Sequence, residues 1–239
     1  MSNARKTGAI RDSKYDRFKR AKREMDIRPV FFIASEGENT EPDYFGKILA
    51  GLYPNIRVLT LPERKNIGAV RGNDPKKLKK RLQEKLREQA FESIVQREAW
   101  IVVDRDDKTW TVELLNEAAM WVKAENNKRN PVIHGMALSN PCFEFWLLLH
   151  FENGKGAHSS EECISRLKKR IHVPNYDKNK RLDDPNVIKL FSENVIKDAI
   201  KRSETKNRGL SEDWPRQPGH TTVHLLVQRI LDAADKIPR

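Results

Sequence analysis

The sequence has few cysteines and no long apolar segment, and each of these features excludes a class of protein. Only Cys142 and Cys163 are present among 239 residues, too few for a disulfide framework or a four-cysteine zinc site. The longest apolar runs, such as 143–151, fall far short of the roughly 20 residues of a membrane-spanning helix. No apolar segment follows the basic N-terminus, which argues against a secretory signal. We therefore expect a soluble, cytoplasmic protein without structural disulfides and without a membrane partner.

Basic residues outnumber acidic ones, 46 Lys and Arg against 34 Asp and Glu, for a formal net charge of +12. Such an excess indicates a polyanionic partner, most often nucleic acid or a membrane surface. Half of the excess lies in residues 1–29, where ten basic residues face four acidic ones. We expect a basic arm there, whose Arg17, Lys19 and Arg20 contact nucleic acid. A solvated, weakly ordered terminus is the alternative.

Apolar segments of strand length alternate with segments of helical pattern from residue 30 to residue 151. The predicted strands are 30–34, 56–61, 100–103 and 132–138. The predicted helices that follow them are 40–52, 76–91, 112–126 and 142–151. This alternation predicts an α/β fold with a mainly parallel four-stranded sheet flanked by helices.

Beyond residue 151 the sequence predicts only helices and loops. Helices are expected at 161–171, 186–202 and 222–236. We therefore divide the chain into a basic N-terminal arm (1–29), an α/β core (30–151) and a helical C-terminal portion (152–239) packed on that core.

Acidic residues follow the predicted strands at the edge where open parallel sheets bind ligands. Glu36 follows the first strand, and Asp104, Asp106 and Asp107 follow the third. In an extended segment, Asp104 and Asp106 point to the same side. Glu144 lies one helical turn after the fourth strand, in an otherwise apolar helix. Because a buried acid needs a partner, Glu144 is a candidate for the same site.

Several carboxylates at one sheet edge repel one another unless a cation neutralises them. Oxygen ligands without His or Cys favour Mg²⁺ or Mn²⁺ over zinc. A divalent ion in a strongly basic protein is typical of phosphodiester chemistry. The alternative is structural: Asp106 or Asp107 then only starts a loop, and Glu38 and Glu41 only complement a helix dipole.

The helix predicted at 76–91 is strongly basic. Its candidate contacts to nucleic-acid phosphates are Lys76, Lys77, Lys80 and Arg81, and Arg105 is a further candidate beside the acidic residues. A solvated helix face is the alternative interpretation of the same residues.

Four blocks of the sequence resemble one protein family. The blocks are 31–45 with Ser35-Glu36-Gly37-Glu38, 102–107 with Asp104-Arg105-Asp106-Asp107, 138–151 with Asn140-Pro141-Cys142-Phe143-Glu144, and 218–227. In their order, and over nearly the whole chain, they resemble the RloB-like proteins of bacterial and archaeal defence loci. The last block departs from the pattern, because Gly219-His220 stands where a serine-like residue is expected after the proline.

The resemblance implies a Toprim-type fold, the metal-dependent α/β domain of topoisomerases, primases and related nucleases. It assigns the role of general acid or base to Glu36 and an Mg²⁺-binding pair to Asp104 and Asp106. Asp107 and Glu144 are the candidates for further metal ligands. Glu38 and Asn140 are the candidates for residues that support the ligands.

The leading hypothesis is therefore a Mg²⁺- or Mn²⁺-dependent nuclease that cleaves RNA or DNA, tRNA included, in anti-phage defence or abortive infection. The resemblance also implies an ATPase partner subunit. The alternative is a non-catalytic subunit of a defence complex that binds nucleic acid or docks a partner, with binding indifferent to Mg²⁺. A third hypothesis is nucleotidyl transfer of the ligase or primase kind, but no ATP-binding lysine motif supports it.

Overall fold

The computed structural model describes residues 28–61, 75–89, 96–105, 110–129, 131–169, 173, 176–178, 182–210 and 214–237. Five candidate residues lie outside these ranges, namely Arg17, Lys19, Arg20, Asp106 and Asp107. None of the helices in these ranges combines the length and the apolar character that crossing a bilayer requires.

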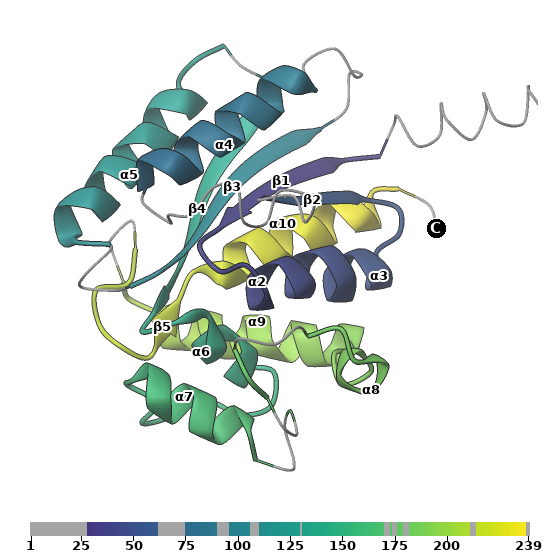
Figure 1. Ribbon diagram of the computed structural model, residues 1–239, viewed down its shortest axis with the longest axis vertical. Helices are drawn as coiled ribbons and strands as arrows, with labels where there is room; N and C mark the ends of the chain where they lie inside the picture. Colours follow the sequence, from purple (N-terminus) through teal and green to yellow (C-terminus); the bar gives the residue numbers. More distant parts are fainter. Residues whose placement is uncertain are drawn as a thin grey trace, which may run out of the picture.

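A five-stranded sheet forms the centre of the molecule (Figure 1). Its strands, in the order β2-β1-β3-β4-β5, are β1 (Val30–Ser35), β2 (Arg57–Leu61), β3 (Arg97–Asp104), β4 (Val132–Asn140) and β5 (His220–Thr221). The first four are parallel, and β5 is antiparallel to β4. The predicted α/β class and mainly parallel sheet are confirmed. The predicted number of strands was one too low, because a two-residue strand produces no periodicity in the sequence.

Helices connect the strands and continue after the sheet. Those that follow β1, β2 and β3 are α2 (Thr40–Asp43), the π-helical η1 (Tyr44–Leu49), α3 (Ala50–Leu52), α4 (Pro75–Glu88) and α5 (Val112–Asn126). Those after β4 are α6 (Phe143–Leu148), α7 (Ser160–Leu167), α8 (Pro185–Ile188), α9 (Glu193–Asn207) and α10 (Val223–Asp235). The prediction of a single helix at 186–202 is wrong. The chain forms α8 and then α9, whose N-cap Ser192 accepts a hydrogen bond from the backbone N–H of Val195.

The sheet is buried on both faces, as its near-continuous apolar strands predict. Along β1, Phe31 and Ile33 face one hydrophobic core, whereas Phe32 and Ala34 face another. Helices α4 and α5 cover the second face, and the α2–η1–α3 segment and α10 cover the first (Figure 1). The two cores thus fix the position of every strand end.

The helices after residue 151 share the larger core with the sheet. Cys163 of α7, Ile196 of α9 and Ile230 of α10 are buried in one cluster with Phe31 of β1. Burial of apolar side chains contributes roughly 25 cal/mol per Å² removed from water. These helices therefore help to hold the sheet, and α6 begins directly at its carboxyl edge.

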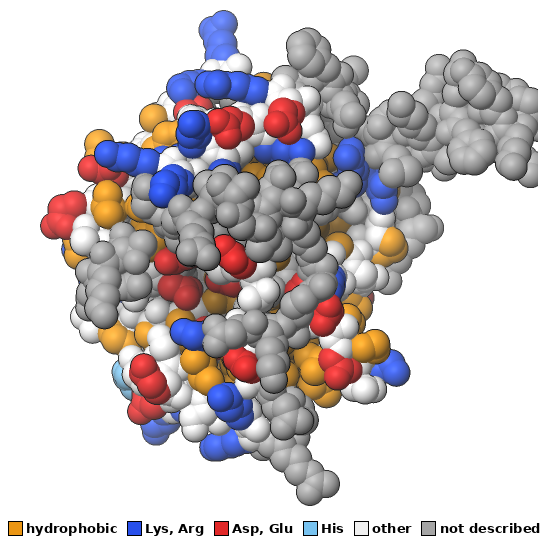
Figure 2. All heavy atoms as spheres, viewed as in Figure 1, with side chains coloured by type: hydrophobic (Ala, Val, Ile, Leu, Met, Phe, Trp, Pro, Cys, Tyr) orange, Lys and Arg blue, Asp and Glu red, His pale blue; other side chains and the backbone are white. Residues whose placement is uncertain are grey.

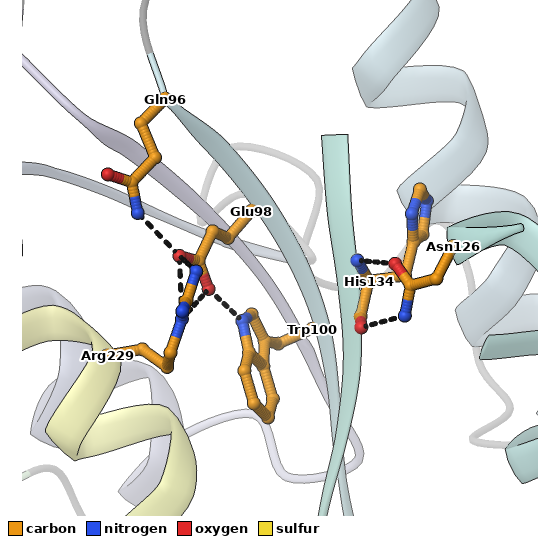
Figure 3. A network of polar contacts seen from close by, with 6 residues as sticks. All are labelled: Gln96, Glu98, Trp100, Asn126, His134 and Arg229. Carbon is orange, nitrogen blue, oxygen red and sulfur yellow. Dashed lines mark hydrogen bonds and ion pairs between the residues drawn. The ribbon is translucent and has the colours of Figure 1, made fainter. Parts of the chain in front are cut away.

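Glu98 of β3 is a fully buried carboxylate whose partners come from its own strand segment and from α10 (Figure 3). Arg229 of α10 donates to Oε1 from Nε at 3.0 Å and from Nη2 at 2.6 Å. Trp100 Nε1 donates to Oε2 at 3.0 Å, and Gln96 Nε2 donates to Oε1 at 2.7 Å. The bonds to Glu98 raise the pKa of Arg229. A buried charge is tolerated only with such partners, so this group ties α10 to the sheet.

Asn126, the last residue of α5, covers part of the open edge of β4. The backbone N–H of His134 donates to Asn126 Oδ1 at 2.8 Å, and Asn126 Nδ2 donates to the His134 carbonyl at 2.9 Å (Figure 3). β5 pairs with β4 only at Ser139 and Asn140. A side-chain amide therefore takes the place of a neighbouring strand and protects this edge.

We predict that Arg229→Met lowers the free energy of unfolding by about 3 kcal/mol, because it leaves the Glu98 carboxylate buried without its cation. Arg208→Met, which removes an exposed guanidinium near the end of α9, should change it by less than about 0.5 kcal/mol. Urea denaturation of both variants measures the difference. Equal midpoints would contradict a stabilising role for the Glu98–Arg229 pair.

Candidate functional site

A cavity of about 410 Å³ opens at the carboxyl ends of β1, β3 and β4. Its acidic lining residues are Glu36, Glu38, Glu41, Asp104 and Glu144, and its basic ones are Arg105 and Lys178. Acidic side chains are visible in the middle of the face shown in Figure 2, with Lys and Arg side chains concentrated over α4 at its top. Open parallel sheets bind their ligands at this edge.

Glu36 reaches the cavity because β1 ends one residue earlier. Its backbone N–H donates to the Val102 carbonyl at 3.2 Å and so continues the pairing of β1 with β3. Ser35 Oγ donates to the Gly37 carbonyl at 3.0 Å and shapes the turn that follows. The Glu36 side chain is only partly buried, and it therefore remains accessible from the cavity.

Asp104 ends β3 beside the start of α6. It pairs in register with Ser139 of β4, and the next backbone N–H, that of Arg105, donates to the Ser139 carbonyl at 2.7 Å. The backbone N–H of Phe143, at the start of α6, donates to the Asp104 carboxylate. The parallel pairing of β3 with β4 thus brings Asp104 to the turn of helix that carries Glu144.

Glu41 belongs to the site, although its sequence position suggested only a helix-dipole role. Its side chain is 6% exposed and lies against Gly37, where a Cβ would stand 2.0 Å from Glu41 Oε2. A residue with a side chain at position 37 would therefore displace this carboxylate. The glycine four residues before Glu41 is the feature of the sequence that could have indicated this position. Only the fold of the turn shows that Gly37 leaves room for the Glu41 carboxylate.

Burial and mutual repulsion make these acids hard to ionise together. Burial, with the charges of Glu144 and Glu36, raises the pKa of Glu41 from 4.5 to about 7. Burial also raises the pKa of Asp104, with further contributions from Glu41, Glu144 and Glu36. A cavity in which four carboxyl groups affect one another in this way attracts either protons or a cation.

Tyr176 fixes Glu144 from the far side of the cavity. The Tyr176 hydroxyl donates to Glu144 Oε1 at 2.7 Å and lies 3.1 Å from Thr40 Oγ1. All three side chains are buried. Burial, followed by the charge of Glu144, raises the pKa of Tyr176, so the phenol stays protonated and keeps donating. No motif in the sequence pointed to Tyr176, which lies 32 residues from Glu144.

Three other candidates, Glu38, Asn140 and Arg105, occupy different positions. Glu38 lines the cavity as an exposed side chain at its rim. Asn140 is buried, and its Nδ2 donates to the carbonyls of Arg216 and Pro215 at 3.0 and 3.3 Å. Its side chain therefore holds the segment that leads into β5. Arg105 lines the cavity, and its Nη1 also donates to the Trp110 carbonyl at 2.9 Å.

The basic residues predicted to bind phosphates lie at the start of α4. Lys76, Lys77 and Lys80 are exposed, and Arg81 is partly buried. Because α4 follows β2 in a parallel sheet, its first turns lie toward the edge that carries the cavity. The first turn contains no acidic residue, although a helix N-terminus favours negative charge. A polyanion would supply that charge.

The donor set of the cavity fits a hard divalent ion. Asp104 Oδ1 is buried and has no hydrogen-bond partner among the described residues. All the acidic groups offer oxygen, the ligand that Mg²⁺ and Mn²⁺ prefer. Within the ranges that the structure describes, no three His, Cys, Asp or Glu side chains are already arranged as a ligand shell. Binding would therefore require small side-chain movements or the neighbouring Asp106 and Asp107, which lie outside those ranges.

We predict that Glu41→Gln stabilises the ion-free protein at about pH 8. Folding raises the pKa of Glu41 from 4.5 to about 7. The contribution of this carboxyl to the free energy of unfolding is therefore fully present below pH 4.5 and is lost as the pH rises through 7. The free energy of unfolding of Glu41→Gln should exceed that of the wild type by on the order of 2 kcal/mol at about pH 8, and the difference should vanish near pH 4. Urea denaturation in EDTA at both pH values measures it.

Glu117→Gln is the control for this substitution, since Glu117 is exposed on α5. It should leave the pH dependence unchanged. A Glu41→Gln variant that tracks the wild type at every pH would show that the carboxyl groups do not repel one another.

Comparison with protein families supports the resemblance seen in the four sequence blocks. A family model described as RloB-like protein matches residues 31–230 of the chain. The matched range includes all the candidate residues of the cavity and most residues of the two cores. Searches of curated proteins and of solved structures found no match. The predicted family is therefore confirmed.

Proposed function

Since this chain belongs to the RloB-like protein family, we propose that it hydrolyses phosphodiester bonds of RNA or DNA in a metal-dependent reaction. The observation that carries the proposal is the convergence of Glu36, Asp104 and Glu144 in one cavity of a strongly basic protein. Carboxylates that raise one another's pKa are costly unless they serve a cation or a proton transfer.

Asp104 and Glu144 are the residues proposed to hold Mg²⁺ or Mn²⁺, together with Asp106 and Asp107, which follow Asp104 closely in the sequence. Such an ion, when bound, would lower the pKa of a water molecule and neutralise developing phosphate charge. Tyr176 keeps Glu144 in one orientation through its hydrogen bond to Oε1. A fixed carboxylate loses less freedom when it binds an ion, which favours binding.

Glu36 and Glu41 are suited to move protons. Glu36 is the more accessible, so its carboxylate is proposed to accept the proton of the attacking water. In the ion-free cavity, burial raises the pKa of Glu41 to about 7, so this carboxyl carries its proton part of the time at neutral pH. This proton can be given to the leaving oxygen of the cleaved strand. Two carboxyl groups in different environments thus divide the roles of base and acid.

Basic residues around the cavity are proposed to hold the nucleic-acid backbone. Arg105 and Lys178 line the cavity itself. Lys76, Lys77, Lys80 and Arg81 on α4 would extend the contact, and Arg17, Lys19 and Arg20 of the N-terminal arm would add to it. Each phosphate contact of this kind makes binding weaker as salt increases.

The biological setting of the proposal comes from the family resemblance. We place the reaction in anti-phage defence or abortive infection, with tRNA among the candidate substrates and an ATPase as a candidate partner subunit. A non-catalytic subunit of a defence complex would bind the same nucleic acids without using the carboxylates for chemistry. Metal binding and cleavage by purified protein distinguish the two.

We predict that millimolar Mn²⁺ or Mg²⁺ raises the melting temperature of the wild type and not that of Asp104→Asn. An ion that binds only the folded state stabilises it by mass action. In EDTA, Asp104→Asn should melt above the wild type because it removes one repelling charge. The control Asp198→Asn, exposed on α9, should respond to the ion as the wild type does. Identical ion responses in all three proteins would contradict metal binding at Asp104.

We predict that Glu36→Gln reduces cleavage of RNA or DNA by roughly 100-fold or more while its affinity for the same strand is kept. The amide occupies the same volume but cannot accept the proton. Gel assays with labelled strands in Mn²⁺ measure cleavage, and fluorescence anisotropy measures affinity. Glu117→Gln, an exposed change on α5, is the matched control. Full cleavage by the Glu36→Gln variant would remove this residue from the reaction.

A further inference from the structure

A second cavity, of about 400 Å³, lies between α9 and the loop that follows α6. Four of its six lining residues are cations, and the other two are neutral polar residues. They are Lys155, Lys201, Arg202, Lys206, Asn153 and Thr205. No residue of this cavity lines the acidic one. The two cavities therefore differ in both place and charge.

Helix α9 presents most of these residues on one face. Lys201 and Thr205 are four residues apart, as are Arg202 and Lys206, so each pair lies one turn apart on the helix surface. The buried residues of α9, among them Ile200 and Ser203, face the core instead. Like charges at this spacing destabilise a helix by a few tenths of a kcal/mol, and an anion between them would remove that cost.

Two of the four cations, Arg202 and Lys206, are held in place by contacts of their own. Arg202 Nη1 donates to the Leu149 carbonyl at 2.7 Å and to the His150 carbonyl at 3.0 Å, at the end of α6. Lys206 Nζ lies 5.6 Å from the centre of the Phe145 ring. Side chains that are fixed before a ligand arrives lose little freedom on binding.

No carboxylate neutralises these charges in the part of the chain that the structure describes. Elsewhere, Lys197 pairs with Glu193 at 2.7 Å and Lys47 pairs with Asp183 at 2.8 Å. Beside the cavity, the Glu152 carboxylate is paired with Arg166. Partial burial, followed by the charge of Arg166, lowers the pKa of Lys206. The cavity thus combines concentrated positive charge with no acidic partner.

We propose that this cavity binds a phosphate group. A phosphate offers several charged oxygens in a tetrahedral arrangement, which suits cations that approach from a helix face and from a loop. Asn153 adds a neutral amide N–H donor, whereas the Thr205 hydroxyl donates to the Lys201 carbonyl at 2.8 Å. The group belongs either to a nucleic-acid backbone or to a small phosphate compound, and both sources share this chemistry. The proposal does not depend on the reaction proposed for the acidic cavity.

The test uses the variant Lys155→Gln/Lys201→Gln/Lys206→Gln. Arg202 is left unchanged because it holds the end of α6, so the fold should be preserved, which circular dichroism checks. The control Lys128→Gln/Lys189→Gln/Lys236→Gln removes the same charge from exposed lysines outside the cavity. Any effect of total charge is therefore equal in the two triple variants.

The first arm measures melting temperature in millimolar inorganic phosphate against sodium chloride of equal ionic strength. Phosphate should raise the melting temperature of the wild type and of the control, and not that of the cavity variant. The second arm measures, in EDTA, the affinity for a short single-stranded RNA of mixed sequence by fluorescence anisotropy. A backbone phosphate in the cavity predicts about tenfold weaker binding by the cavity variant and a salt slope smaller by about 0.7.

The two arms also separate the sources. Loss of the phosphate response with unchanged RNA affinity assigns the cavity to a small phosphate compound, and weaker RNA binding assigns it to the backbone. The proposal is overturned if the cavity variant shows the same phosphate-induced change in melting temperature and the same RNA affinity as the wild type. It is likewise overturned if both quantities equal those of the control variant. Cleavage by the wild type is scored separately, so failure of the nuclease proposal would be recognised independently.

Discussion

Electrostatic repulsion among the carboxylates at one sheet edge is the constraint on which the arrangement of this protein depends. Glu36, Asp104 and Glu144 lie in one cavity because β1, β3 and β4 are parallel and end together. Burial, followed by the charges of the neighbouring carboxylates, raises the pKa of Glu41 and of Asp104. The two hydrophobic cores that hold the strands must offset this cost. Functional sites often lower the stability of the folded state in this way, because the arrangement that the function requires is not the most stable one.

The four sequence blocks of the family have different structural tasks. Blocks 31–45, 102–107 and 138–151 carry the acidic residues of the cavity. Block 218–227 forms β5 and starts α10, and it supports β4 from outside. In that block, Gly219 has a φ of 84°, and its N–H donates to the Asn140 carbonyl at 2.8 Å. Gly219-His220, where the resemblance implied a serine-like residue, therefore lies in a supporting turn and not in the cavity.

Arg105 and Lys178 line the acidic cavity, and further positive charge lies outside it. The start of α4 carries exposed lysines without acidic residues in its first turn. Lys201, Arg202 and Lys206 of α9 line the second cavity, beside the loop that follows α6. In contrast, Arg229 is used inside the protein, where it pairs with the buried Glu98. The basic excess thus divides between surfaces that can meet a polyanion and one pair that stabilises the core.

The sequence by itself determined the parallel strands and the acids that follow them. Both are local properties, since strand periodicity and chain direction place Glu36 and Asp104 at one edge without knowledge of other contacts. Only the tertiary structure decided which further residues join them. Tyr176 reaches Glu144 across 32 residues, and Arg229 reaches Glu98 across 131. Such contacts depend on how the later helices pack, and no pattern near either residue specifies that packing.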